Sequence, residues 1–189
     1  MSKQHKICVL AGLSGVGKSF LINRLTKDYS GYVHFSAGAL IKKRRSSIDH
    51  DELRLLPDDE VLRNQYLLID QFQQEISEIK ESTTVLFDAH MIIDMDTSLF
   101  EIPFDIFARL SPDHFVYLSE NPGIIAYRRI GDTSRKRPNR TIMELTQQQD
   151  RSLELAKNYA DKLGIEFEQM QSANIEALER IMNKIGLAS

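Results

Sequence analysis

Residues 12–19 read Gly-Leu-Ser-Gly-Val-Gly-Lys-Ser, which fits the pattern G-x-x-x-x-G-K-[ST]. A short, partly β-branched apolar run at residues 7–11 comes before this stretch, and residues 20–27, with Leu21 and Leu25 four apart, come directly after it. These flanks predict a strand and a helix on either side of a turn. The stretch therefore predicts a phosphate-binding loop, because glycines allow a tight turn whose N–H groups, with the start of the helix, face an anion.

The side chains of this loop suit a nucleotide triphosphate with a bound metal. Lys18 is expected to reach the β- and γ-phosphates, and the Ser19 hydroxyl is expected to hold Mg²⁺. The alternative is a glycine-rich turn without a ligand, but a string of this kind arises by chance in roughly one chain of this length in a hundred. The residues expected to contact the nucleotide are Gly12, Ser14, Gly15, Val16, Gly17, Lys18, Ser19 and Phe20.

Beyond the loop, segments with strand and helix patterns alternate along the chain. Strands are predicted at residues 7–11, 32–35, 83–87, 114–118 and 165–170. Helices are predicted at residues 20–27, 39–45, 103–110, 145–163 and 174–185, with two more that begin at Pro57 and Pro122. This alternation predicts an α/β fold, a doubly wound sheet of five parallel strands covered by helices on both faces. At 189 residues, the chain is expected to form a single domain.

Apolar residues at helical spacing indicate which faces are buried. In the helix that begins at Pro57, the predicted stripe consists of Leu62, Tyr66, Ile69, Phe72 and Ile76. Phe100, Phe104 and Phe107 also fall at helical spacing. We assign these three to the core rather than to a base-stacking site.

Composition excludes several classes of protein. The formal net charge of −3 is unlike that of the clearly basic domains that bind nucleic acid, so nucleic acid is not an expected partner. The single cysteine, Cys8, permits neither an intramolecular disulfide nor an all-cysteine metal site. No apolar stretch approaches the roughly eighteen residues of a membrane span, and the short run after Lys3 and Lys6 does not make a signal peptide. These features predict a cytoplasmic protein.

Three further segments carry a resemblance to a known family. They are residues 34–42, reading His-Phe-Ser-Ala-Gly-Ala-Leu-Ile-Lys, residues 85–90, reading Val-Leu-Phe-Asp-Ala-His, and the arginine cluster after Arg128. Together with the phosphate loop, they resemble the nucleoside monophosphate kinases, most closely the archaeal-type adenylate kinases, in the same order over nearly the whole chain. The resemblance implies ATP and Mg²⁺ as cofactors and transfer of the γ-phosphoryl group of ATP to a nucleoside monophosphate such as AMP.

By this resemblance, residues 36–82 form the monophosphate-binding region. Bacterial adenylate kinases read S-T-G-D-x-x-R at its start, where this chain has Ala37 in place of threonine and Lys42 in place of arginine. A lysine binds phosphate as a point charge without the two-pronged contact of arginine, so weaker or broader base selectivity is expected. The implied acceptor-binding residues are Ser36, Gly38, Lys42, Arg54, Asp88 and His90. The alternative for residues 42–45 is a solvated helix face or a nucleic-acid patch.

Asp88 is expected at the carboxyl end of the third strand, beside the phosphate loop. A carboxylate there is well placed to hold Mg²⁺ directly or through its water shell. The archaeal-type kinases carry D-T-H at this point, against Asp-Ala-His here, and the alternative is that Asp88 only starts a turn. His90 has no carboxylate partner visible in the sequence, so a structural or substrate-positioning role is expected rather than that of a general base.

Six cations lie between residues 128 and 140, in a segment interrupted by Gly131, Asp132 and Pro138. A basic, turn-rich segment suits a short lid, at about residues 131–141, that folds over ATP and neutralises charge on the transferred phosphoryl group. By the resemblance, Arg129 flanks the adenine, and Arg135 and Arg137 are the catalytic lid arginines. The remaining cations are Arg128, Lys136 and Arg140. The alternative, a nucleic-acid or localisation patch, would lack interleaved aromatic residues for stacking on bases.

Two other functions share these features. A kinase for a different small metabolite, of the shikimate or gluconate kind, has the same loop, the same sheet and a lid that contains Arg-Pro, and it differs in the acceptor that it phosphorylates. A nucleotide-dependent regulatory or assembly factor would bind ATP to change its affinity for a partner. Such a factor would show slow ATPase activity that does not depend on an acceptor.

Overall fold

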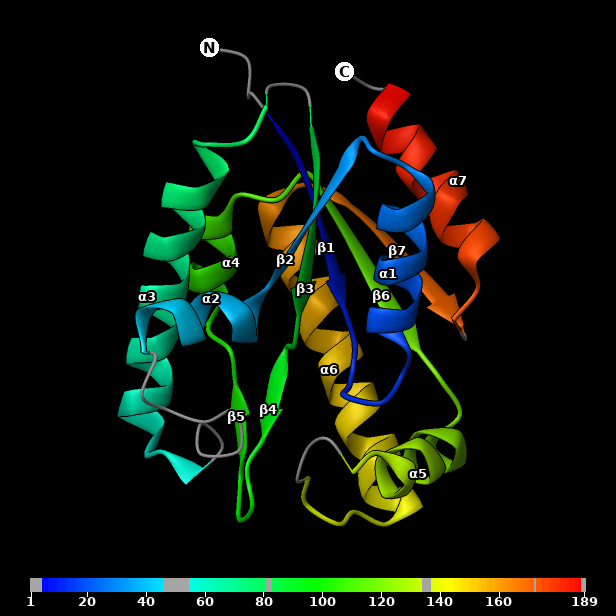
Figure 1. Cartoon of the computed structure of the whole chain (residues 1–189). Coiled ribbons are helices and arrows are strands. Elements are labelled where there is room, and N and C mark those ends of the chain that lie inside the picture. The colour runs from blue at the N-terminus through cyan, green and yellow to red at the C-terminus, as the bar shows by residue number, and fades with distance from the viewer. Residues whose placement is uncertain (1–4, 46–54, 81–82, 134–136, 172, 188–189) are drawn as a thin grey trace.

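The computed structural model describes residues 5–45, 55–80, 83–133, 137–171 and 173–187. A parallel sheet of five strands forms the centre of the molecule, in the order β2-β3-β1-β6-β7 (Figure 1). The strands are β1 (Lys6–Ala11), β2 (Tyr32–Ser36), β3 (Thr84–Ala89), β6 (His114–Ser119) and β7 (Glu166–Gln171). The predicted α/β fold with five parallel strands is confirmed.

The central strands are buried on both faces, which explains their nearly continuous apolar sequences. On β1, Val9 and Ala11 point into one core, whereas Cys8 and Leu10 point into the other. Parallel pairing of β1 with both β3 and β6 brings the carboxyl ends of these strands to one edge of the sheet. The loops that follow the strands at this edge form the candidate site.

Helices cover both faces of the sheet. The core with Val9 also contains residues of α2 (Ala37–Arg44), α3 (Asp58–Ile76), α4 (Phe104–Leu110) and α6 (Ile142–Leu163). The core with Leu10 contains residues of α1 (Lys18–Asp28), α5 (Pro122–Gly131) and α7 (Ile175–Leu187). Figure 1 shows α1 and α7 on one side of the sheet and α3, α4 and α6 on the other. In the part of the chain that is described, no helix has the length and apolarity needed to cross a bilayer.

An antiparallel hairpin, formed by β4 (Ile92–Asp94) and β5 (Leu99–Glu101), was not predicted from the sequence patterns. Each strand has three residues, which is too short to show an alternating pattern. Phe100 therefore lies in a strand and not, as predicted, on one helix with Phe104 and Phe107. The assignment of all three to the core holds, because Phe107 is buried and the other two pack against the same cluster.

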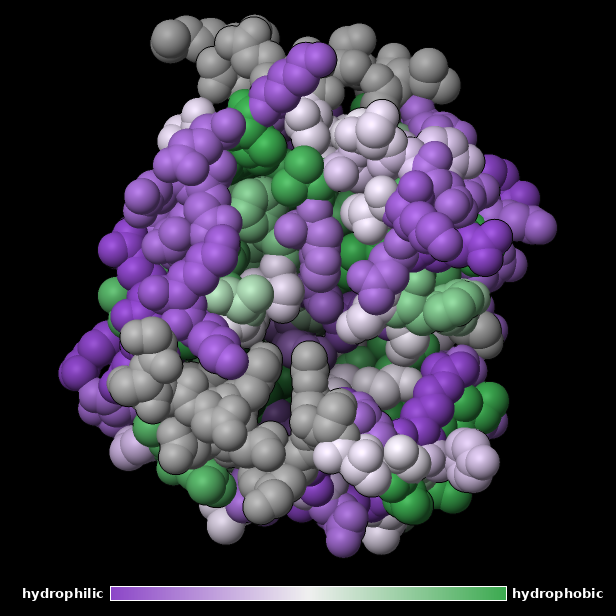
Figure 2. All heavy atoms as spheres, in the orientation of Figure 1, coloured by the Kyte–Doolittle hydropathy of each residue, from purple (hydrophilic) through white to green (hydrophobic). Residues whose placement is uncertain are grey.

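The buried face of α3 matches the predicted stripe at Ile69 and Phe72, and Tyr66 and Ile76 pack against the same core, but its first half is rotated by about one residue. Leu62 and Tyr66 are only half-buried, whereas Val61 and Leu68 are buried. The opposite face of α3 is hydrophilic in the space-filling view (Figure 2). The rotation places the amides of Asn64 and Gln65 on the inner face of the helix, where they meet the candidate site.

Candidate active site

The phosphate loop passes from the end of β1 to the start of α1, close to β6. Its backbone takes positive φ at Gly12 and Gly17, with values of 149° and 109°. A Cβ on Gly12 would lie 2.4 Å from the carbonyl oxygen of Leu118, which is backbone of β6. The loop therefore needs glycine at this point, because a side chain would collide with the neighbouring strand.

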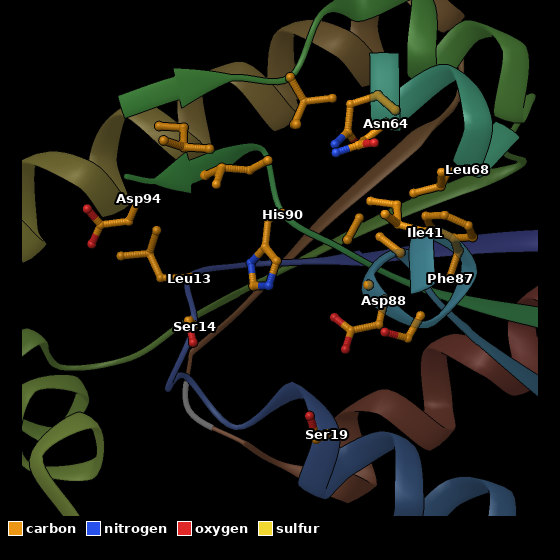
Figure 3. A pocket seen from close by; sticks show the side chains of 18 of the residues that line it. Leu13, Ser14, Ser19, Ile41, Asn64, Leu68, Phe87, Asp88, His90 and Asp94 are labelled. Atoms are coloured by element: carbon orange, nitrogen blue, oxygen red, sulfur yellow. The ribbon is translucent and has the colours of Figure 1, made fainter. Parts of the chain in front are cut away.

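Lys18, Asp88 and His90 come together beside the loop. Figure 3 shows Asp88 and His90 near Ser14 and Ser19. The buried ammonium of Lys18 donates a hydrogen bond of 2.7 Å to the carbonyl of Gly12 and lies 3.7 Å from Oδ1 of Asp88. Nδ1 of His90 lies 3.5 Å from the same ammonium and 3.0 Å from the same carbonyl. This contact with the loop gives His90 a fixed place at the wall of the site.

Asp88 lies one residue before the end of β3 rather than at its end, in register with Leu10 of β1 and Ser36 of β2. Among the described residues, no hydrogen-bond donor meets its buried Oδ1. A buried carboxylate oxygen of this kind is expected to have a partner. The carboxylate is therefore suited to a ligand that brings positive charge or a donor into the site.

Three arginines hold the outer side of the phosphate loop through its oxygen atoms. Arg128 donates to the carbonyl of Val16 at 3.0 Å, and Arg129 donates to the carbonyl of Ser14 at 2.9 Å. Arg137, from the predicted lid, donates through Nε to Oγ of Ser14 at 2.9 Å and through Nη2 to Asp132. Its buried Nη1 has no hydrogen-bond partner in the described part of the chain.

Two pockets meet at the loop. The first, of about 370 Å³, surrounds the loop itself and is lined by residues that include Gly15, Gly17, Lys18, the exposed Phe20 and Arg128. The second, of about 450 Å³, lies between α2, α3, the hairpin and α6. Both are lined by Leu13, Ser14, Ser19, Asp88, His90 and Arg137. We call the first the loop pocket and the second the deep cavity.

The walls of the deep cavity are mainly apolar, with Ile41, Val61, Leu68, Phe87, Ile92, Ile102 and Phe107 among them. Three buried carboxamides, those of Asn64, Gln65 and Gln148, interrupt this apolar surface. Oε1 of Gln148 has no hydrogen-bond partner among the described residues. Figure 3 shows Asn64 at the far side of His90 from Ser14 and Ser19, so this amide lies deep in the cavity.

Charged groups gather at the loop end of the deep cavity. The described cations of its lining are Arg129 and Arg137, both of which contact Ser14. His34 also lines the cavity, and burial lowers its pKa, an effect that the Asp88 carboxylate opposes. The lowered pKa favours the uncharged imidazole at neutral pH. Beside the inner part of the cavity, Arg45 donates to Oδ1 of Asn64 at 2.9 Å and to Glu60 at 2.8 Å.

The predicted acceptor residues Ser36, Gly38, Asp88 and His90 all line the deep cavity. Lys42 does not line either pocket but lies exposed on α2, directly after the buried Ile41. Val16 is buried in the core, and its carbonyl rather than its side chain faces Arg128. Arg54 and Arg135, and with them a predicted acceptor residue and a predicted lid arginine, lie outside the described residues.

Sequence reasoning missed the three carboxamides and Asp94, an acidic residue of the hairpin that contacts two arginines. A signal for the amides is present in the pattern. Gln65 stands in the apolar series of Val61, Leu68 and Phe72, and Gln148 stands three residues after Leu145. A polar residue within a buried stripe needs a hydrogen-bond partner, which can be a ligand.

A sequence profile of the AAA domain family matches residues 11–146, most of the chain. The chain belongs to the AAA domain family. With its phosphate loop and five-stranded sheet, this AAA domain is a P-loop domain of the kinase type, as the sequence predicts.

Curated relatives cover nearly the whole chain. An adenylate kinase from Methanoculleus marisnigri is 26% identical over 178 residues, which cover 89% of this chain and 91% of the relative. An adenylate kinase from Pyrococcus abyssi is 25% identical over 185 residues, covering 95% and 92%. An adenylate kinase from Pyrococcus furiosus is 26% identical over 192 residues, with the same coverage. The predicted resemblance to archaeal adenylate kinases is confirmed.

Proposed function

We propose that this AAA domain transfers the γ-phosphoryl group of Mg·ATP to a nucleoside monophosphate, with AMP as the first candidate. The observation that carries the proposal is the deep cavity, an apolar space with buried carboxamides that opens directly onto the phosphate loop. Its volume of about 450 Å³ falls within the range of small-molecule sites. The names of the relatives support the same acceptor.

The loop pocket has the groups that the donor phosphates need. Backbone N–H groups of a glycine-rich turn and the start of α1 attract phosphate oxygens, and Lys18 adds a positive charge. The buried Nη1 of Arg137 supplies a donor that the described protein groups leave unused. These groups stabilise the charge that spreads over the transferred phosphoryl oxygens.

Two oxygen ligands lie where a magnesium ion is expected. Ser19 lines both pockets, and Oδ1 of Asp88 is buried without a hydrogen-bond donor among the described residues. Hydroxyl and carboxylate oxygens are the ligands that Mg²⁺ prefers, so Ser19 and Asp88 would hold the ion directly or through its water. When bound, the ion neutralises negative charge on the phosphates.

The acceptor side of the proposal follows from the chemistry of the cavity walls. A nucleobase is flat and largely apolar, and its edge carries hydrogen-bond donors and acceptors that suit Asn64, Gln65 and Gln148. A polyhydroxy acid would need polar contacts around its whole body and a cation for its carboxylate. The inner part of the cavity presents buried amides among apolar side chains, and Arg45 beside it is already paired with Glu60 and Asn64, so we favour the nucleotide acceptor.

In this arrangement, the protein acts mainly by positioning. Because the two pockets share part of their lining, an acceptor phosphate in the deep cavity would lie beside the γ-phosphate in the loop pocket. The loose transition state of phosphoryl transfer needs little help from a base. His90, fixed against the Gly12 carbonyl, then orients substrate at the junction. Exclusion of water from the junction limits hydrolysis of ATP.

The test is ADP release with Mg·ATP over a panel of nucleoside monophosphates. We expect AMP, or a closely related monophosphate, to raise the rate above the acceptor-free rate. Lys18→Ala should lower this stimulated rate about 10²- to 10³-fold, because a charge on the transition state is lost. Lys27→Ala is the matched control, since this lysine lies exposed on the same helix and outside both pockets. If no nucleoside monophosphate of the panel raises the rate of ADP release, the proposal is refuted.

Oδ1 of Asp88, which the Lys18 ammonium approaches only to 3.7 Å, also favours a second candidate, a kinase for a hydroxyl-bearing metabolite. A carboxylate beside the γ-phosphate can accept the proton of an attacking hydroxyl. The same assay with shikimate and gluconate separates the two, because only one class of acceptor should stimulate ADP release. Slow release that no acceptor changes would instead support a regulatory ATPase.

A further inference from the structure

Asp94, the last residue of β4, binds two arginines from different segments of the chain. Its Oδ2 accepts a hydrogen bond of 3.2 Å from Nη1 of Arg129, at the end of α5. Its Oδ1 accepts from Arg140, through Nε at 3.1 Å and Nη2 at 2.9 Å. Figure 3 shows the Asp94 carboxylate turned away from His90.

All three side chains are largely buried, with exposed fractions of 15% for Asp94, 8% for Arg129 and 17% for Arg140. Ion pairs that are shielded from water are held more firmly than exposed pairs, since removal of one partner leaves a buried charge uncompensated. Arg140 also donates to the carbonyl of Met95, the residue after Asp94. The contact is therefore a fixed junction between the hairpin and the segment before α6.

One of these two arginines, Arg129, also reaches the phosphate loop. Arg129 donates through Nε to the Ser14 carbonyl while its Nη1 holds Asp94, and Arg137 binds the Ser14 hydroxyl. Burial and the nearby charges of Arg137 and Arg140 lower the pKa of Arg129, and Asp94 opposes this effect. Asp94 thus balances the charges of Arg129 and Arg140 beside the loop, as Asp132 does for Arg137 and Glu120 for Arg128.

The strand that carries Asp94 is also a wall of the deep cavity. Ile92, Ile93 and Asp94 line it, and Ile92 is part of the core. An acceptor that fills the cavity must press against this strand. A shift of β4 would move Asp94, the shift of Asp94 would move Arg129, and the shift of Arg129 would reach the phosphate loop.

We propose that Asp94 is a positioning residue that couples the acceptor wall of the deep cavity to the arginines on the phosphate loop. The inference rests on the proposed function, because it assumes that an acceptor occupies this cavity. Asp94 fixes the positions of Arg129 and Arg140. These positions allow the arginines that contact the loop to bind the phosphates in the geometry that transfer requires. Without its carboxylate, the arginines still attract ATP but no longer hold that geometry.

The test compares Asp94→Asn with a matched control, Glu101→Gln. Glu101 is also a carboxylate of the hairpin paired with an arginine, Arg151 of α6, but this exposed pair does not touch the loop. In Asp94→Asn we expect AMP-stimulated ADP release to fall about 10- to 100-fold, as for a small misplacement of reacting groups. The dissociation constant for ATP should stay unchanged or decrease, since two guanidinium groups lose their anion. Glu101→Gln should stay within about twofold of the wild type in both measurements.

The measurement of ATP binding distinguishes a positioning role of Asp94 from a general loss of structure at the site. If ATP binding weakens in parallel with transfer, or if transfer is unchanged, the inference is wrong. If Asp94→Asn does not fold, Arg140→Lys serves in its place, because lysine keeps the charge but cannot hold Asp94 and the Met95 carbonyl together. A smaller loss of transfer with intact ATP binding is then expected, and wild-type transfer would overturn the inference. A wild-type protein that no nucleoside monophosphate stimulates would contradict the proposed function instead.

Discussion

Gly12→Ala tests whether the path of the phosphate loop beside β6 depends on the missing side chain. The new Cβ would lie 2.4 Å from the Leu118 carbonyl oxygen, at least 0.6 Å closer than the 3.0 Å below which real Cβ atoms essentially never approach. The backbone φ of 149° is also unfavourable for alanine. A strained backbone costs about 1–3 kcal/mol and overpacking about 1–3 kcal/mol, so we expect a loss of about 3 kcal/mol in the free energy of unfolding.

For a chain of this size, that loss corresponds to a decrease in Tm of roughly 6–12 °C. We also expect at least tenfold weaker binding of ATP, because the loop must move to relieve the collision. Thermal unfolding followed by circular dichroism, with and without Mg·ATP, measures both effects. Gly31→Ala is the control, since a Cβ there would meet nothing within 4 Å, and it should change stability by no more than about 1 kcal/mol. A Tm for Gly12→Ala within about 2 °C of the wild type would refute the reasoning.

Two further predictions concern charge. Arg137→Ala should lower kcat by about 10²-fold while weakening ATP binding much less. The reason is that the buried Nη1 of Arg137, which has no hydrogen-bond partner among the described residues, is expected to act on the transition state. Equal losses in kcat and in the affinity for ATP, measured by steady-state kinetics and calorimetry, would contradict this role. At the far end of the sheet, burial lowers the pKa of His114, although Glu168 and Glu166 oppose the effect and Lys184 adds to it. The unfolded chain then binds a proton more readily than the folded protein, so stability is full above about pH 6.5 and decreases as the pH falls below it. Tm measured from pH 8 to pH 5 should show a shallower decrease in His114→Gln, and identical slopes would count against the prediction.

The sequence contained enough information for the five-stranded sheet and for the position of the phosphate loop. Apolar runs separated by helical patterns required a parallel sheet, because strands that are buried on both faces lack alternation. The phosphate loop is local, so Gly12, Lys18 and Ser19 could be placed from their spacing alone. The same reasoning placed Asp88 at the edge of the sheet, within one residue of where β3 ends.

Contacts between distant segments could not be read in this way. The hairpin strands are three residues long, and the partners of Asp94 lie 35 and 46 residues away in the chain. No local pattern links an acidic residue to arginines at such separations. Lys42, which is predicted from its motif-like segment to bind the acceptor phosphate, lies exposed on α2 outside the lining of both pockets, and only the fold showed that position.

The sequence by itself determined which segments form the five-stranded sheet, which loop carries the phosphate-binding motif and which family the chain resembles, because each of these depends on residues that are neighbours in the chain. Only the tertiary structure decided what faces that loop. Packing of α3 and α6 on one face of the sheet turned Asn64, Gln65 and Gln148 into a common cavity. Packing of the hairpin against α5 and the segment before α6 placed Asp94 between two arginines, and neither arrangement is encoded in local spacing.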